Sequence, residues 1–169
     1  WRTFRERHPN WHVVFNEGNK KPHRAYGKPI ATSGSDLQAR SWHFIANELV
    51  GFGIPASQLE LIGTHESAKY QFANFRQLHE GLEIINSRLT LKFSKSGEVI
   101  LFGLDVFENI QLSTNPAISA EQARNLSQAD LSHITGSRVE PNLKVLAIPR
   151  SHDYLYRLVY EVTFDPMGH

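Results

Sequence analysis

Histidine is the residue type with the most potential for chemistry in this sequence. Nine histidines occupy positions 8, 12, 23, 43, 65, 79, 133, 152 and 169. Only His8 and His12 have the i, i+4 spacing that places two ligands on one face of a helix, and Pro9 disfavours a helix continuing from His8. Glu66 and Glu80 directly follow histidines, and adjacent residues of a strand point to opposite faces. The spacing therefore does not favour a dedicated metal site.

The consecutive residues Ser151, His152 and Asp153 have the side chains of a hydrolase triad. A working triad is assembled from residues distant in sequence, each side chain aimed at the next. Three consecutive residues cannot adopt that arrangement, so we interpret the segment as a hairpin loop. The sequence also lacks a His-Glu-x-x-His helix, a Gly-x-Ser-x-Gly elbow, a P-loop and a dinucleotide fingerprint. We therefore assign no catalytic, cofactor-binding or metal-ligating residue and expect no enzymatic activity and no cofactor.

Composition is that of an ordinary soluble globular protein, with 40% hydrophobic and 21% charged residues. Cysteine is absent, which excludes disulfide bonds and a cysteine nucleophile. No apolar run approaches the ~20 residues of a membrane-spanning helix, so we expect no membrane span. The sequence starts with Trp1 where a native chain starts with Met, so we expect it to begin inside a longer chain.

Positive charge is concentrated near the N-terminus, although the whole chain has a formal net charge of +1. Residues 1–30 contain seven Lys or Arg residues and two Glu residues, with aromatic residues between them. Basic segments with interleaved aromatics occur in nucleic-acid-binding proteins. The apolar run at residues 11–15 instead favours a strand whose aromatic side chains anchor a core. We adopt the second interpretation and expect no nucleic-acid partner.

The strongest local pattern lies in residues 69–107. Residues 88–93 alternate strictly between apolar and polar side chains, which predicts a half-buried strand. Residues 94–97 end in glycine and predict a hairpin loop of three to five residues with a bulge. A second apolar strand is expected at 99–107 and a preceding one at 69–77, with a shorter apolar run after Gly81. The sequence therefore predicts an antiparallel meander.

Two segments predict helices that flank this meander. Ser35 and Gln38 have the spacing of a capping box, and apolar residues then recur at helical spacing to about residue 50. Trp42 on this helix is expected to pack on the sheet, although a ligand pocket there is an alternative. A second capping box at Ser119 and Gln122 predicts a helix over residues 119–135. We expect an α+β fold of two lobes, each an antiparallel sheet covered by one main helix.

The remaining segments complete the predicted lobes. The first lobe covers residues 1–112 with an N-terminal extension, and the second covers residues 113–169. A polar linker at 111–116 marks the boundary between them. Further expected segments are a short helical or irregular piece before residue 11, a strand at 11–15, a polar connection at 20–29, a short apolar connection or edge strand at 58–62, and strands at 143–148 and 154–164.

Two parts of the sequence resemble modules of protease precursors. An aromatic-rich strand, the segment at 78–87 and the turn at 94–99 resemble the fungalysin/thermolysin propeptide (FTP) motif. Glu83 departs from the family pattern, in which a proline is common at this position. The later part of the chain is similar to the PepSY module, which commonly follows the FTP motif. The resemblance rests on a helix from Ser119 followed by a strand with the sequence Tyr-Leu-Tyr-Arg-Leu-Val-Tyr-Glu-Val. The two resemblances together cover residues 36–164.

The resemblance implies a non-catalytic prodomain of a secreted thermolysin/fungalysin-type zinc metalloprotease. Its partner would be the catalytic domain of the cognate metalloprotease in the same chain, for which it would act as intramolecular chaperone and inhibitor. The expected location is secreted or in the cell envelope. An alternative is a free-standing binding or adaptor module of the cell envelope with the same fold. A third reading, an enzyme with a histidine-lined cleft, requires a zinc-dependent activity that no motif in the sequence indicates.

Overall fold

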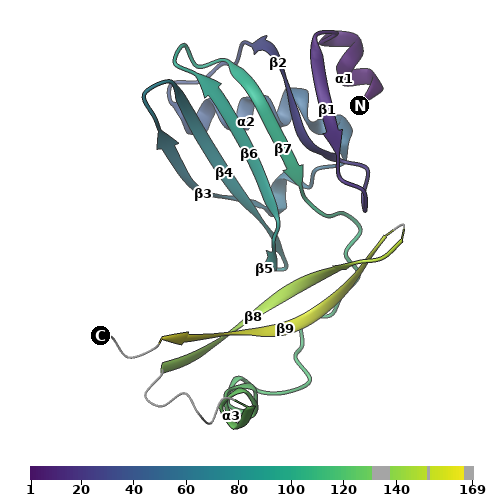
Figure 1. Cartoon of the computed structure of the whole chain (residues 1–169), viewed down its shortest axis with the longest axis vertical. Coiled ribbons are helices and arrows are strands. Elements are labelled where there is room, and N and C mark those ends of the chain that lie inside the picture. The colour runs from purple at the N-terminus through teal and green to yellow at the C-terminus, as the bar shows by residue number, and fades with distance from the viewer. Residues whose placement is uncertain (131–137, 152, 166–169) are drawn as a thin grey trace.

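The structure is a computed structural model, and it describes residues 1–130, 138–151 and 153–165. These residues form three α-helices and nine β-strands (Figure 1). The helices are α1 (Arg2–Arg7), α2 (Leu37–Glu48) and α3 (Ala120–Asp130). The strands are β1 (Trp11–Phe15), β2 (Pro22–Ile30), β3 (Leu59–Glu66), β4 (Tyr70–His79), β5 (Leu82–Ile85), β6 (Arg88–Ser94), β7 (Val99–Asp105), β8 (Arg138–Pro149) and β9 (Tyr154–Asp165).

Hydrogen bonds connect the nine strands of the described residues into one sheet, in the order β1-β2-β7-β6-β4-β5-β8-β9, with β3 also paired to β4. Paired strands are antiparallel except β5 and β8, which are parallel where Ile84 meets Val145 and Ile85 meets Leu146. A large sheet with few helices confirms the α+β class. The arrangement as two antiparallel lobes is not confirmed, because the parallel β5–β8 pair continues the sheet from one predicted lobe into the other.

Helix α2 covers one face of the part of the sheet built from β1–β7 and lies behind it in the view of Figure 1. Three side chains of β6 lie on this covered face and are each 0% exposed: Leu89, Leu91 and Phe93. The alternation predicted for residues 88–93 is therefore confirmed. Phe44 of α2 packs against Phe102 of β7, with ring centroids 5.9 Å apart. This covered face holds the larger hydrophobic core.

The N-terminus of α2 differs in detail from the predicted capping box. Asp36 is the N-cap residue, and its carboxylate accepts a hydrogen bond of 2.8 Å from the backbone N–H of Ala39. This hydrogen bond lowers the pKa of the Asp36 carboxyl. Ser35 donates to the Asp36 carboxylate, so the predicted pairing of Ser35 with Gln38 is wrong. A carboxylate is the stronger acceptor, and its charge suits the positive end of the helix dipole.

Two strands are longer than the sequence indicated. The expected polar connection at 20–29 is mostly strand β2, which lies between β1 and β7. Its Ala25 is fully buried, whereas Arg24 and Tyr26 lie on the opposite face. A strand with one solvated face keeps polar residues at alternate positions, so its average composition resembles that of a loop. The edge strand expected at 58–62 extends to Glu66 as β3 for the same reason.

Two turns of the meander contain residues in the left-handed conformation. Gly97 in the β6–β7 loop has φ +86°, and the Ser94 backbone N–H donates to the Glu98 carbonyl at 2.8 Å. The predicted glycine-containing hairpin loop is confirmed. Between β4 and β5, Glu80 and Gly81 have φ values of +48° and +85°. These turns fix which side chains of β4, β5 and β6 share a face.

A smaller core joins β8 and β9 to the rest of the molecule. Ile84, Phe107 and Val145 are its buried residues. Tyr154 of β9 contacts Phe107 edge-on, with centroids 4.9 Å apart, and its hydroxyl donates to the side chain of Asn16 at 3.1 Å. The β8–β9 ribbon is thus joined to the rest of the molecule through β5 at Val145 and through Tyr154 near its loop. Figure 1 shows β5 beside the ribbon.

The buried Gln77 fixes where the chain leaves the meander. Its side-chain amide donates to the Phe107 carbonyl at 2.6 Å, and its side-chain oxygen accepts from the Phe107 N–H at 2.7 Å. The same amide donates to Gln58, and the Gln77 backbone N–H donates to Ser87. Strand β7 ends at Asp105, so this amide pair supplies the hydrogen bonds that a neighbouring strand would otherwise give to Phe107.

Helix α3 packs beside the β8–β9 ribbon and begins with the predicted capping box. The Ser119 hydroxyl accepts from the Gln122 N–H at 3.1 Å, and the Gln122 side chain accepts from the Ser119 N–H at 2.8 Å. The helix is described to Asp130, and the remainder of the predicted 119–135 segment lies outside the described residues. Strands β8 and β9 contain the segments expected at 143–148 and 154–164.

Candidate binding surface

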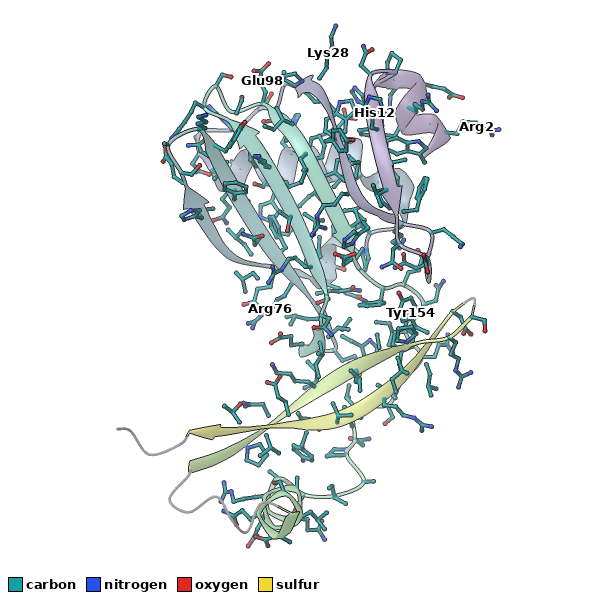
Figure 2. The ribbon with its side chains drawn as sticks, viewed as in Figure 1. Arg2, His12, Lys28, Arg76, Glu98 and Tyr154 are labelled. Carbon is teal, nitrogen blue, oxygen red and sulfur yellow. The ribbon has the colours of Figure 1, made fainter. Side chains whose placement is uncertain are left out.

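The face of the sheet opposite α2 has no helix over it within the described part of the chain (Figures 1 and 2). We call it the uncovered face. The strand register places alternate side chains of β1, β2, β7, β6, β4 and β3 on it. Its members are His12, Val14, Arg24, Tyr26, Leu101, Asp105, Arg88, Thr90, Lys92, Tyr70, Phe72, Asn74, Arg76, Glu60 and His65.

One cluster on the uncovered face combines aromatic rings with a cation. The Lys92 ammonium lies 3.6 Å from the ring centroid of Tyr70 and 5.7 Å from that of Phe72. His65 on β3 stacks on Phe72, with centroids 6.0 Å apart. Aromatic side chains are enriched at protein interfaces, and a cation over a ring face is attracted to it electrostatically.

Apolar surface is also exposed at the other end of this face. Tyr26 is 49% exposed and lies 5.6 Å from the ring of His12. Val14 on β1 is 56% exposed. Apolar surface on these two neighbouring strands can bury area against a partner.

A charged pocket of about 500 Å³ lies at the edge of the uncovered face, next to the β8–β9 ribbon. Four cationic side chains line it, each from a different strand: Arg24, Arg76, Arg88 and Lys144. Three carboxylates line it as well: Glu83, Asp105 and Glu161. Figure 2 labels Arg76, which lies where the meander faces the ribbon.

Ion pairs link most of these charges across the junction. Arg76 bonds Glu60 at 2.8 Å and Glu83 at 3.3 Å, while Lys144 contacts Glu83 at 3.3 Å and Glu161 at 2.7 Å. The hydrogen bond from Arg76 lowers the pKa of Glu60. The hydrogen bond to Glu161 raises the pKa of Lys144, with Glu83 adding to the effect. Glu83 therefore joins a cation of the meander to one of the ribbon.

A glycine makes room for one of the pocket cations. A Cβ placed on Gly103 of β7 would lie 2.6 Å from the Arg24 guanidinium and 2.7 Å from the backbone oxygen of His23. Arg24 crosses β7 at this point and approaches Asp105 at 3.5 Å. The Gly103 position therefore lets Arg24 lie flat on the uncovered face.

A second pocket, of about 640 Å³, lies between α3 and the β8–β9 ribbon. Apolar side chains from both elements line it, including Leu143, Leu158 and Val162. Leu126 of α3 also lines it and is 61% exposed. Helix α3 therefore covers its side of the ribbon less tightly than α2 covers the meander.

The histidines do not form a metal site in the described residues, where no group of three or more potential ligands occurs. His8 contacts Glu48 at 2.8 Å, and His23 contacts Asp105 at 2.7 Å. His79 lies 3.0 Å from the carbonyl of Leu112. Each of these histidines has one hydrogen-bonding partner and a local structural role.

Other residues considered from the sequence have structural positions. Trp42 contacts Phe75 of the sheet edge-on at 5.0 Å, so the expectation of core packing is confirmed. Phe4 and Trp11 of the basic N-terminal segment are each 2% exposed and belong to the larger core. Ser151 and Asp153 lie in the turn between β8 and β9, and His152 lies outside the described residues.

Sequence reasoning missed the uncovered face and its charged pocket as a candidate site. The polar positions of β6 were recognised as facing away from the core, but nothing in one strand shows which neighbours lie beside it. The pocket collects residues between positions 24 and 161, so only the sheet order brings them together.

No family model matches the chain, and no curated protein matches it. Among solved structures it is similar to the Bacillus megaterium YpeB C-terminal domain, with a TM-score of 0.45 and 15% sequence identity. The similarity covers 94% of this chain and 68% of that chain. A likeness of this extent carries no conclusion about function. In the described residues, no helix has the length and apolar character needed to cross a membrane.

Proposed function

We propose that this chain is the non-catalytic prodomain of a secreted thermolysin/fungalysin-type zinc metalloprotease. The observation that carries the proposal is the uncovered face, which is built from six strands and includes aromatic and arginine side chains. Such residues are enriched at the centres of protein interfaces. The segment that resembles the FTP motif, at 78–87, supports it, because it forms the β4–β5–β6 turns beside this face.

The two proposed jobs, chaperone and inhibitor, have one physical basis. A surface that binds the native catalytic domain better than its unfolded form stabilises the native form by mass action. Covalent linkage in one precursor raises the effective concentration of that surface. The same bound surface restricts access to the protease until the linkage is cleaved and the prodomain departs.

Strand edges offer a second mode of contact. Strand β3 pairs with β4 and has no second partner strand among the described residues, and the same is true of β9 next to β8. An extended segment of the catalytic domain can add to such an edge through main-chain hydrogen bonds. Edge pairing provides affinity, and the side chains of the uncovered face provide selectivity.

The proposal keeps the two units implied by the resemblance. Residues 1–112 form the FTP-like unit with its N-terminal extension, and residues 113–169 form the PepSY-like unit. The smaller core and the ion pairs of Glu83 hold the units together in the free chain. These contacts allow the two units to bind the protease as one surface.

The test adds the purified chain to the mature protease that is encoded in the same precursor. We expect slower hydrolysis of a peptide substrate at micromolar chain and a higher yield when the denatured protease refolds with the chain present. A chain carrying Leu91→Asp, which removes the fold, is the control and is expected to do neither. If the wild-type chain changes neither hydrolysis nor refolding yield, the prodomain function is wrong and the envelope adaptor becomes the better hypothesis.

A further inference from the structure

We propose that the charged pocket is the docking site for an acidic side chain of a polypeptide partner, with Arg88 as its anchor. This inference rests on the proposed function only for the identity of that polypeptide as the protease. The pocket itself is defined by its charges, its apolar rim and its position at the edge of the uncovered face.

The ion pairs around the pocket leave one of its cations without a carboxylate partner. Four cations and three carboxylates line the pocket, and Glu60 beside it also pairs with Arg76 at 2.8 Å. Both oxygens of Asp105 are engaged, one with His23 at 2.7 Å and the other with Arg24 at 3.5 Å. Glu83 and Glu161 are engaged with Arg76 and Lys144. The carboxylates of the pocket are therefore already shared among its other cations.

Arg88 is the cation that remains. It stands opposite Asp105 in the β6–β7 register, is exposed, and makes no ion pair with any described residue. A guanidinium presents two parallel N–H donors that match a carboxylate, and it keeps its charge at all physiological pH values. An incoming carboxylate would pair with Arg88 without displacing an existing ion pair.

The pocket also has an apolar component, which favours a polypeptide over a small inorganic anion. Ile62 and Ile85 line it, and Ile62 is 49% exposed. The side chains of Glu and Asp carry their carboxylates on methylene groups that can pack against such residues. The aromatic cluster at Phe72 lies on the same face, four residues along β4 from Arg76, and can receive residues further along the partner polypeptide.

The experiment uses the full chain and a defined probe, acetyl-Glu-Glu-Glu-amide, followed by two-dimensional NMR. We expect shifts of backbone amides at residues 85–88, at Asp105 and at Lys144. Arg88→Gln is expected to weaken binding by about tenfold, the usual effect of losing a hydrogen bond to a charged group. Arg2→Gln, an exposed arginine of α1 that Figure 2 places far from the pocket, is the matched control and should bind like the wild type.

Three results would overturn the inference. The first is an absence of shifts at the pocket amides. The second is equal affinity for the Arg88→Gln and Arg2→Gln chains. The third is binding of inorganic phosphate or acetyl-Gln-Gln-Gln-amide at the same amides with equal or higher affinity at matched ionic strength.

The inhibition assay separates this inference from the proposed function. If the wild-type chain inhibits the protease and Arg88→Gln inhibits it about tenfold less well, both stand. If the wild-type chain does not inhibit but still binds the glutamate peptide through Arg88, the prodomain function fails and the acidic docking site stands. If the wild-type and Arg88→Gln chains inhibit equally and bind the peptide equally, the docking site fails and the prodomain function stands.

Discussion

The two ends of the sheet bury very different amounts of apolar surface. In the β1–β7 part, Phe44, Phe75 and Phe102 are each 0% exposed and belong to one large core. Beside the β8–β9 ribbon, α3 buries Ala123, while its Leu126 is 61% exposed. The first region has a core of the kind that stabilises an independent domain. The second depends on its neighbours for most of its packing.

Because of this difference, the two regions contribute differently to the proposed binding surface. A well-packed meander can hold the uncovered face in a fixed shape, which keeps the entropy cost of binding low. The ribbon is fixed at its loop end by Phe107 and its tyrosines, and by the ion pairs of Lys144. The part of the ribbon near its loop can therefore contribute to a docking surface, while the opposite end of the ribbon packs less tightly.

The largest expected effect comes from breaking the larger core. Leu91→Asp places an unpaired charge at a fully buried position, which costs several kcal/mol against a total stability of roughly 5–15 kcal/mol. We expect the β1–β7 region to unfold, and the ribbon to lose its anchor with it. Circular dichroism and thermal denaturation measure this directly.

The control is Thr90→Asp on the next residue of the same strand. Thr90 lies on the uncovered face, where its hydroxyl donates to the Asn74 side chain at 3.0 Å. The new carboxylate would lie between Arg88 and Lys92, so we expect a stability change within about 1 kcal/mol. Equal thermal stability of the two variants would contradict the assignment of the covered and uncovered faces.

A smaller effect is expected from breaking the junction between the regions. Gln77→Leu leaves the buried N–H and C=O of Phe107 without their partner, and each unsatisfied group costs about 1–3 kcal/mol. We expect a loss of about 2–4 kcal/mol in denaturant unfolding, with faster hydrogen exchange at Phe107. Gln71→Leu, at a half-buried position of the same strand, should cost less than about 1 kcal/mol. Similar losses for both variants would show that the amide pair does not hold the junction.

Local patterns were sufficient to predict most of the secondary structure. The alternation of Leu89, Leu91 and Phe93 and the capping box at Ser119 are short-range signals, and both are confirmed. Strand β2 was missed because its polar residues lie on a face that no helix covers. The N-cap of α2 was misplaced by one residue because Ser35 and Asp36 are both good caps, and the stronger acceptor forms the bond.

Long-range features could not be predicted in the same way. The parallel β5–β8 pair involves two residues of each strand, and no periodicity in the sequence marks it. Arg88 was recognised as facing away from the core, but its lack of an ion pair depends on how Arg24 and His23 share Asp105. That sharing requires the order β2-β7-β6, which is a property of the assembled sheet.

The smallest effect is expected from the first turn of α3, and it tests most directly whether the two regions unfold separately. Ser119→Ala removes the hydroxyl that accepts from the Gln122 N–H, which costs about 1 kcal/mol of helix stability. Because α3 is loosely packed, we expect the loss to appear locally. Hydrogen exchange of the α3 amides should accelerate by about fivefold, while exchange in the β1–β7 core and the global unfolding midpoint stay unchanged.

The control for this prediction is Ser127→Ala on the same helix. The Ser127 hydroxyl donates to the Ala123 carbonyl at 2.7 Å, a bond to the preceding turn that slightly destabilises helices. Alanine is the better helix former, so exchange in α3 should slow or stay unchanged. If Ser119→Ala instead lowers the global midpoint as much as it destabilises α3, the helix unfolds together with the meander. The two regions would then be one cooperative unit, because the smaller core would couple them more strongly than their packing indicates.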